Sequence, residues 1–351
     1  MNWRKMKFKE ALTYDDILLI PQYSEIESRK EIDISNELHK NIHLTLPIVS
    51  SPMDTVTNSD MAIAMHDAGG LGVIHRYNSI DKQVEQVIKV KKALGGWASN
   101  KSFIAAAVGM TGHYYERAAE LITYGAKVIC IDVAHGHHIL MKKAIQTLKK
   151  DYGSDIHIMA GNVATLQGFN DLADWGADSI RCNIGGGSIC STRIQTGHGM
   201  PGLQTIIDCA KSDRDVKIIA DGGIKNSGDI VKALAAGADF VMLGSLLAGT
   251  NESPGDVIVG TLSSKRKVYR GMASKEAQFE WKGKYSSNEG ISATVPYKGS
   301  VKEVLKDLRN GIVSGLSYSG ARTIRELQAK AKFIRQTTAG LNESRTHILR
   351  G

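Results

Sequence analysis

The stretch Lys217-Ile-Ile-Ala-Asp-Gly-Gly-Ile-Lys-Asn-Ser-Gly-Asp-Ile-Val-Lys-Ala-Leu-Ala-Ala-Gly-Ala-Asp-Phe-Val-Met-Leu-Gly-Ser245 contains one complete unit of the fold. It begins and ends with short apolar runs, residues 217–220 and 240–243. Between them, residues 228–236 place apolar side chains at helical spacing, and Gly237 stands where a helix C-cap needs left-handed backbone. A strand, a helix and a second strand in this order are typical of a parallel α/β fold.

The same unit recurs along the chain. Short β-branched runs occupy residues 47–50, 71–75, 103–108, 128–133, 156–160, 179–182, 217–220 and 240–243. Helix-length segments between them include residues 61–68, 115–124, 166–175, 203–211 and 228–236. Eight such units predict a (β/α)8 TIM barrel of about 250 residues. A doubly wound open sheet is the alternative, and the lack of a GxGxxG motif after the first strand disfavours it.

Length and composition describe an ordinary globular chain. It has 351 residues, is 42% hydrophobic, and contains 36 glycines but only 6 prolines. We expect residues 1–351 to form a single catalytic barrel domain. Residues 1–46 are predicted to be a lead-in with a β-hairpin, and residues 254–300 a long connection. Because long loops in compact domains are often functional, we interpret residues 273–288 as a mobile flap.

Charge and cysteine content narrow the class of protein. The net charge of +8 is spread along the chain without an aromatic-interleaved basic block, so we expect no nucleic-acid partner, and a basic active-site mouth explains the charge equally well. Cys130, Cys182, Cys190 and Cys209 form no CxxC pair, which favours free thiols in a reducing compartment. No apolar stretch of signal-peptide or membrane-spanning length occurs, so we expect a cytoplasmic protein without a membrane partner.

Polar residues follow the predicted strands, at the end of a barrel where active sites lie. They occur at Ser50 to Asp54, His75-Arg76, Gly109 to Thr111, Asp132 to Gly136, Gly161-Asn162, residues 185–190, Asp221 to Gly223 and Gly244-Ser245. The glycine turns after strands seven and eight predict a phosphate site, because barrels commonly bind phosphate there. The alternatives are glycines that serve only as turn residues, and a flavin barrel that binds FMN phosphate.

A glycine-rich loop after the sixth strand presents a cysteine. It reads Asn183-Ile-Gly-Gly-Gly-Ser-Ile-Cys190-Ser-Thr192-Arg193. Consecutive glycines let the backbone approach a ligand closely, and hydroxyls and a cation beside a thiol favour its reactive form. An isolated cysteine is more often a small buried apolar residue, but its place in this loop favours a nucleophile.

Two further groups of residues have competing interpretations. His135, His137 and His138 follow strand four and could suggest a metal site, but the spacing of nearby cysteines and carboxylates does not match zinc sites. Asp132 at the strand end is a candidate for binding ribose hydroxyls, or for a structural helix cap.

From about Leu12 to about Ser344 the sequence resembles the family of inosine-monophosphate dehydrogenase and guanosine-monophosphate reductase. The matching motifs are Leu12-Thr-Tyr-Asp-Asp-Ile-Leu-Leu, Ser51-Pro-Met-Asp-Thr-Val-Thr, Gly161-Asn-Val-Ala-Thr, the loop from Gly185 to Arg193, Ala220-Asp-Gly-Gly-Ile and Tyr269-Arg-Gly-Met. The resemblance implies a (β/α)8 barrel, usually a homotetramer, that acts on a purine mononucleotide. Only residues 78–102 separate strands two and three, so the paired regulatory domains often inserted there are expected to be absent.

The resemblance also implies residue roles. Cys190 would add to C2 of the purine, with Thr192 and Glu289 handling the departing amine. Asp221 would bind the ribose, and the phosphate would be held by Ser188, Gly223, Gly244, Ser245 and Tyr269. The base would contact Ser51, Met53, Gly271, Met272 and Glu289, and the nicotinamide cofactor would face Asp132, Asn162 and Gly185. The dehydrogenases of this family bind a monovalent cation with carbonyls of this loop. The resemblance therefore leaves potassium binding by the carbonyls of Gly185, Gly187 and Cys190 as an alternative.

Two activities fit this resemblance, and the flap distinguishes them. The dehydrogenase oxidises IMP to XMP with NAD and uses an arginine-tyrosine pair on its flap to activate water, whereas the reductase deaminates GMP to IMP with NADPH. Residues 273–288 contain no such pair; Lys284-Tyr285 is the nearest approximation, and lysine lacks the delocalised guanidinium. Dehydrogenase-like segments at residues 226–234, 249–255 and 339–344 favour the alternative. We weight the flap more heavily and predict a GMP reductase.

Three residues depart from the family pattern around the catalytic cysteine. Asn183 stands where the family has glycine, Gly186 where it usually has proline, and Gly202 where it often has glutamine. The departures predict a looser loop, with a changed substrate preference as one outcome.

Overall fold

Eight parallel strands close into a barrel, as the repeated strand-helix pattern predicts. The structure is a computed structural model that describes residues 8–39, 42–96, 103–260, 264–284 and 288–346. Around the barrel the strands follow the order β10-β11-β4-β5-β6-β7-β8-β9, and β9 pairs with β10 to close it. They are β4 (Ile48–Ser50), β5 (Leu71–Ile74), β6 (Ile104–Val108), β7 (Ala126–Asp132), β8 (His157–Val163), β9 (Ser179–Cys182), β10 (Lys217–Asp221) and β11 (Phe240–Leu243). The closed barrel confirms the predicted fold class and excludes the open sheet.

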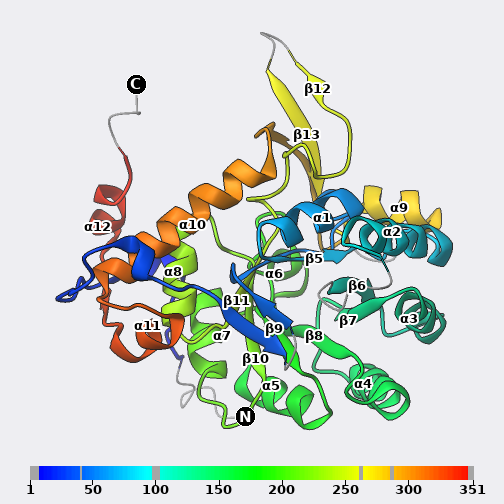
Figure 1. Ribbon diagram of the computed structural model, residues 1–351, viewed down its shortest axis with the longest axis horizontal. Coiled ribbons are helices and arrows are strands. Elements are labelled where there is room, and N and C mark those ends of the chain that lie inside the picture. Colours follow the sequence, from blue (N-terminus) through cyan, green and yellow to red (C-terminus); the bar gives the residue numbers. More distant parts are fainter. Residues whose placement is uncertain (1–7, 40–41, 97–102, 261–263, 285–287, 347–351) are drawn as a thin grey trace.

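Helices follow the strands and cover the outside of the barrel (Figure 1). They are α1 (Ser59–Asp67), α2 (Ile80–Ala93), α3 (Tyr114–Thr123), α4 (Ile139–Tyr152), α5 (Leu166–Asp174), α7 (Gly202–Cys209), α8 (Ser227–Ala235) and α10 (Val301–Tyr318), with a short α6 (Thr192–Thr196) before α7. Local signals set their ends. The Asn226 side chain accepts the N–H of Asp229 at the start of α8, and Gly237, just after its end, has a φ of +113° that favours glycine.

Period-two alternation divides the buried residues into two cores. Side chains such as Val128, Cys130 and Ile219 point into the barrel, whereas Ile129 and Ile131 pack outward against the helices. The hairpin of β2 (Asn36–His39) and β3 (Ile42–Leu44) contributes Leu38, Ile42 and Leu44 to the inner core. The lead-in therefore contains the predicted hairpin, which closes the end of the barrel where the strands begin.

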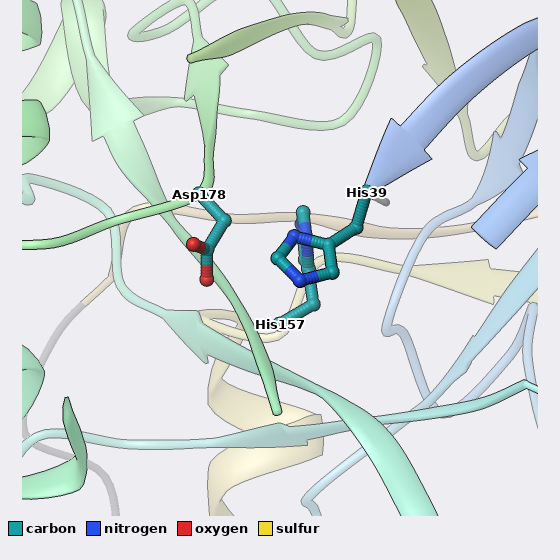
Figure 2. A group of neighbouring side chains, drawn as sticks. All are labelled: His39, His157 and Asp178. Atoms are coloured by element: carbon teal, nitrogen blue, oxygen red, sulfur yellow. The ribbon is translucent and has the colours of Figure 1, made fainter. Parts of the chain in front are cut away.

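A group of two histidines and an aspartate lies where this hairpin meets the barrel, and Figure 2 shows His39, His157 and Asp178 together. The residues have a donor set that a metal could use, but both carboxylate oxygens of Asp178 are bound by Lys149, and one also accepts the N–H of Ile158. The same arrangement recurs without histidines two repeats later, where a carboxylate oxygen of Asp239 accepts the N–H of Ile218. We therefore interpret Asp178 as a structural tie between neighbouring strands.

The long connection after β11 is more ordered than the sequence suggests. It forms a three-stranded sheet of β12 (Ile258–Val259), β13 (Lys265–Arg270) and β14 (Ser292–Pro296), and the β12–β13 hairpin extends away from the barrel (Figure 1). Within residues 273–288, which we interpret as a mobile flap, Lys275–Lys282 form the helix α9, and the mobility of the segment stays a prediction. Ser274 supplies the N-cap and Gly283, with a φ of +69°, ends the helix.

The remaining elements lie at the chain ends. The short strands β1 (Ile17–Leu19) and β15 (Phe333–Arg335) pair antiparallel, and α11 (Ile324–Lys330) and α12 (Thr338–Glu343) complete the C-terminal part. In the portion of the chain that the structure describes, none of the helices combines the length and apolar character needed to span a membrane.

Candidate active site

A cavity of about 500 Å³ opens at the ends of the strands where the sequence places the chemistry. All the residues predicted to take part line it. They are Ser51, Met53, Asp132, Asn162, Gly185, Gly187, Ser188, Cys190, Thr192, Asp221, Gly223, Gly244, Ser245, Tyr269, Gly271, Met272 and Glu289. The structure thus brings together residues from the whole barrel, and their individual roles stay predictions.

The alternation that builds the inner core also positions the polar side chains. Cys130 and Ile219 are inward-facing core residues, and the next inward-facing positions along their strands are Asp132 and Asp221. Because every second side chain of a strand points into the barrel, these carboxylates lie at the cavity floor, directly above the apolar core. The strand pattern therefore determines both the core and the floor of the site.

Cys190 is the first member of a short hydrogen-bonded chain. Its Sγ atom donates to Oγ1 of Thr192 at 3.1 Å, and Oγ1 of Thr192 donates to Oε2 of Glu289 at 2.9 Å. Cys190 is partly exposed to the cavity, whereas Cys130, Cys182 and Cys209 are buried. A thiol, a hydroxyl and a carboxylate in this order can pass a proton from sulfur to the acid.

Backbone hydrogen bonds join the catalytic loop, residues 185–190, to the segment after α9. The N–H of Ser191 donates to the carbonyl of Glu289, and the N–H of Ile291 donates to the carbonyl of Ile189. The N–H of Gly271 donates in turn to the carbonyl of Ile291. The segment that follows the predicted flap is therefore bonded directly to the loop that carries the cysteine, and the segment that precedes the flap is bonded to it through Ile291.

Arg181, a cation at the centre of the site, was not predicted from the sequence. Its guanidinium donates to Asp132 at 2.5 Å and to Asp221 at 2.7 Å, and Asn162 donates to the same Asp221 oxygen at 2.8 Å. Although burial works against the charge, Asp221 and Asp132 raise the pKa of Arg181 above its ordinary value. A charged residue inside the short buried strand β9 was the available signal, because arginine is seldom fully buried without a partner.

A second cation, Arg76, which the sequence places at a strand end without a role, lies on the other side of Asp132. Its guanidinium donates to the carbonyl of Asp132 at 3.0 Å and approaches the carboxylate at 3.6 Å. The ring of Tyr77 lies beneath this guanidinium and contacts Trp281 of α9 edge to face, with 4.8 Å between ring centroids. Helix α9 thus rests on the edge of the cavity beside Asp132.

The opposite end of the cavity has the form expected of an anion site. Gly222 and Gly223 have φ values of +86° and +79°, and a Cβ atom at Gly244 would lie 2.9 Å from the Tyr269 hydroxyl. Burial raises the pKa of Tyr269 to about 12, against a hydrogen bond with Ser188 that lowers it, so its hydroxyl stays protonated and able to donate. Glycine backbone and hydroxyl donors at this position suit a phosphate.

An ion pair connects the base-lining loops to α9. Arg270 donates to Asp54 at 2.5 Å and to Glu280 at 2.6 Å. Met53 precedes Asp54, and Gly271 and Met272 follow Arg270, so each side of the pair continues into cavity-lining residues. Burial raises the pKa of Asp54 while Arg270 opposes the rise.

Several residues considered from the sequence have other partners. His137 contacts Asp171 at 2.7 Å, and the His138 side chain accepts the N–H of Leu140 at the start of α4, which gives both a structural role. Arg193 donates to the carbonyls of Met200 and Ile184. Lys284 and Tyr285 are the nearest approximation to an Arg-Tyr pair in the predicted flap. Lys284 is exposed, and Tyr285 lies outside the described residues.

A family model described as IMP dehydrogenase / GMP reductase domain matches residues 11–347. The chain belongs to the IMP dehydrogenase / GMP reductase family. The family consists of purine-nucleotide oxidoreductases that use NAD(P) cofactors, which agrees with a cavity lined by a partly exposed cysteine and by glycine turns.

Relatives in this family have both names. The inosine-5'-monophosphate dehydrogenase of Nitrosopumilus maritimus (strain SCM1) is 35% identical, with 97% of this chain and 99% of the relative covered. The GMP reductase of Leishmania major is 33% identical, with 96% and 97% covered. A crystal structure of GMP reductase from Trypanosoma brucei in complex with guanosine 5'-monophosphate has a TM-score of 0.91 and 31% identity, and covers 97% of this chain and 98% of that one. Overall identity within the family therefore does not separate the two activities.

Proposed function

We propose that this protein is a GMP reductase that converts GMP to IMP and ammonia with NADPH. Covalent chemistry at C2 is supported by the hydrogen-bonded series Cys190–Thr192–Glu289, with distances of 3.1 and 2.9 Å, and the choice of reductase over dehydrogenase rests on residues 273–288. These hydrogen bonds can deliver a proton to the 2-amino group of the purine, which leaves from C2, the carbon bound to the Cys190 sulfur. In addition, residues 273–288 contain no arginine that could activate water for the dehydrogenase reaction.

The first half of the reaction uses only groups of this chain and the nucleotide. The Cys190 sulfur bonds to C2 of the purine, and its proton passes through Thr192 to Glu289. The 2-amino group takes a proton back along the same path and leaves as ammonia, which breaks the C2–N bond and leaves a thioimidate. The Thr192–Glu289 contact therefore acts first as base and then as acid.

The second half needs a hydride at C2, which NADPH would supply when bound. The C2–S bond then breaks, and the electron pair returns to Cys190 as IMP forms. The sum is GMP, NADPH and two protons to IMP, NADP⁺ and ammonium. Residues suited to the cofactor are Asp132, Asn162 and Gly185, because they line the cavity and the two side chains are held in place by Arg181 and Asp221.

At the other end of the cavity, we assign residues to the ribose, the phosphate and the base of the nucleotide. Asp221 binds the ribose, and the glycine turns at Gly223 and Gly244 bind the phosphate with Ser188, Ser245 and Tyr269. Ser51, Met53, Gly271 and Met272 contact the base. The GMP bound to the Trypanosoma brucei relative supports a purine mononucleotide as the ligand.

The alternative is an IMP dehydrogenase that oxidises IMP to XMP with NAD, and the names of the relatives favour it as much as the reductase. Potassium would accompany that activity through the carbonyls of the catalytic loop. In the structure, the Gly187 carbonyl accepts the N–H of Cys190 at 3.1 Å, which leaves it one lone pair for an ion.

An absorbance assay in both directions tests the proposal. GMP should drive loss of NADPH absorbance and release of ammonia, and Cys190→Ala should abolish both. Formation of NADH from IMP and NAD, without NADPH loss from GMP, would assign the protein to the dehydrogenases instead. NADH in place of NADPH with GMP measures the cofactor preference in the same assay.

A further inference from the structure

Asn183, at the start of the loop that leads to Cys190, combines two unfavourable features. It has a φ of +144°, and it is the non-glycine residue with positive φ in the part of the chain that the structure describes. Its side chain is 3% exposed, and its Oδ1 atom has no hydrogen-bond partner among the described residues. Backbone strain and an unsatisfied buried acceptor often mark functional sites.

The Asn183 amide connects two loops of the site. Its Nδ2 atom donates to the carbonyl of Gly222 at 3.2 Å, and this acceptor fixes which amide atom is the nitrogen. Asn183 leads into the catalytic loop, and Gly222 precedes Gly223 in the proposed phosphate turn. One side chain therefore ties the loop of the nucleophile to the loop of the phosphate.

The same amide fills the space that a side chain at residue 186 would need. A Cβ atom at Gly186 would lie 2.2 Å from Asn183 Nδ2 and 2.8 Å from both Cγ and Oδ1. A Cβ atom at Gly202 would lie 3.0 Å from the same Nδ2 atom. Distances below about 3 Å require atoms to move, so a larger residue at 186 would displace the buried Asn183 amide.

The three positions at which we expect departures from the family pattern lie together in the structure. Gly186 and Gly202 each lie against the Asn183 amide. The expectation of a loose loop is therefore incomplete, because the Asn183 amide supplies packing that residue 186 does not.

We propose that Asn183 is a positioning residue that replaces the side chain of residue 186 as the support of the catalytic loop and sets the distance between Cys190 and the phosphate turn. It acts through the loop and not on the reacting atoms. The inference rests on the proposed nucleotide site but not on the choice between reductase and dehydrogenase.

A double-mutant cycle tests this coupling. In the wild-type background, Gly186→Ala should lower kcat/KM and the rate of Cys190 alkylation by roughly tenfold or more, because the new Cβ displaces the amide. In the Asn183→Gly background the same change should cost less than about twofold, since the clash is gone. Asn183→Gly itself should fold, because glycine adopts the φ without strain, and it should raise KM for the nucleotide more than it changes kcat.

Gly187→Ala is the matched control in the same loop. A Cβ atom there would meet only the Cβ of Cys190, at 3.4 Å, so its effect should be equal in the Asn183 and Asn183→Gly backgrounds. Protection of Cys190 from alkylation is measured with GMP and with IMP, which keeps the test independent of turnover, and unfolding midpoints identify any variant that fails to fold. Equal effects of Gly186→Ala in both backgrounds, or an Asn183→Gly variant with wild-type KM and alkylation rate, would overturn the proposal.

Discussion

The Oγ1 atom of Thr192 lies 2.9 Å from the Oε2 atom of Glu289, although the two residues are 97 positions apart in the sequence. The backbone bond from Ser191 to the Glu289 carbonyl fixes this contact on the side next to Cys190. The proton path therefore depends on two segments that backbone hydrogen bonds hold together.

Removing the hydroxyl from this path should slow the reaction strongly. We expect Thr192→Val to lower the rate of ammonia release about 10²- to 10⁴-fold, which is the usual contribution of a positioned acid or base. Thr192→Ser keeps the hydroxyl and should retain most of the rate. Affinity for the nucleotide, measured by calorimetry, should change little in both variants, and a Thr192→Val enzyme with normal ammonia release would remove the residue from the mechanism.

Arg181 should be essential for stability as well as for the site. Arg181→Met leaves the carboxylates of Asp132 and Asp221 without their shared cation, and breaking a buried pair in this way costs roughly 3–5 kcal/mol. Denaturant unfolding measures the change. Arg214→Met is the control, because Arg214 pairs with Asp174 and Asp213 on the surface and its loss should have no measurable effect. Equal stabilities of the two variants would contradict the assigned network.

The glycine turn after β11 should be specific for the phosphate. A Cβ atom at Gly244 would lie 2.9 Å from the Tyr269 hydroxyl and 3.3 Å from Met53 Sδ, in the space proposed for the anion. Gly244→Ala should weaken binding of GMP at least about tenfold, which is about 1.4 kcal/mol, and should leave binding of guanosine unchanged. If both ligands lose affinity equally, the turn does not recognise the phosphate.

Stability should depend on pH through a buried histidine at the end of β5. Burial lowers the pKa of His75 from 6.5 to about 4, and its Nδ1 atom accepts the N–H of Tyr77. Because the unfolded chain binds the proton first, this contribution is fully present above pH 6.5 and is lost as pH falls to about 4, by up to about 3 kcal/mol. His75→Asn keeps an acceptor without a titrating group and should flatten the loss between these pH values. Burial lowers the pKa of His157 to about 3, so the stability of the variant should still fall with pH through this second histidine.

The strands and the cavity residues at the strand ends could be predicted because local sequence specifies them, whereas cavity residues such as Glu289 were assigned by the family resemblance. Period-two alternation and strand-end polarity are properties of consecutive residues, so Asp132 and Asp221 could be placed at the catalytic end of the barrel without a structure. Arg181 was missed because its function depends on two aspartates on neighbouring strands, and only the closed barrel brings them together. Glu289 and Cys190 were paired by resemblance alone, because no local spacing connects residues so far apart.

The flap and the loop departures show a different limit. Helix α9 was missed because its apolar positions are few, and its position is fixed by tertiary contacts, such as that of Trp281 with Tyr77. The coupling of Asn183 to Gly186 depends on a short distance, because a Cβ atom at residue 186 would lie 2.2 Å from Asn183 Nδ2. The sequence identified both positions as unusual, but only the structure shows that each requires the other.

The most direct test of the central claim is the amount of ammonia released for each NADPH oxidised when the protein acts on GMP. Reductive deamination through Cys190 predicts a ratio of one to one, with IMP as the purine product and no turnover in Cys190→Ala. Oxidation of NADPH without ammonia, or a protein that is inactive on GMP but forms NADH from IMP and NAD, would contradict it.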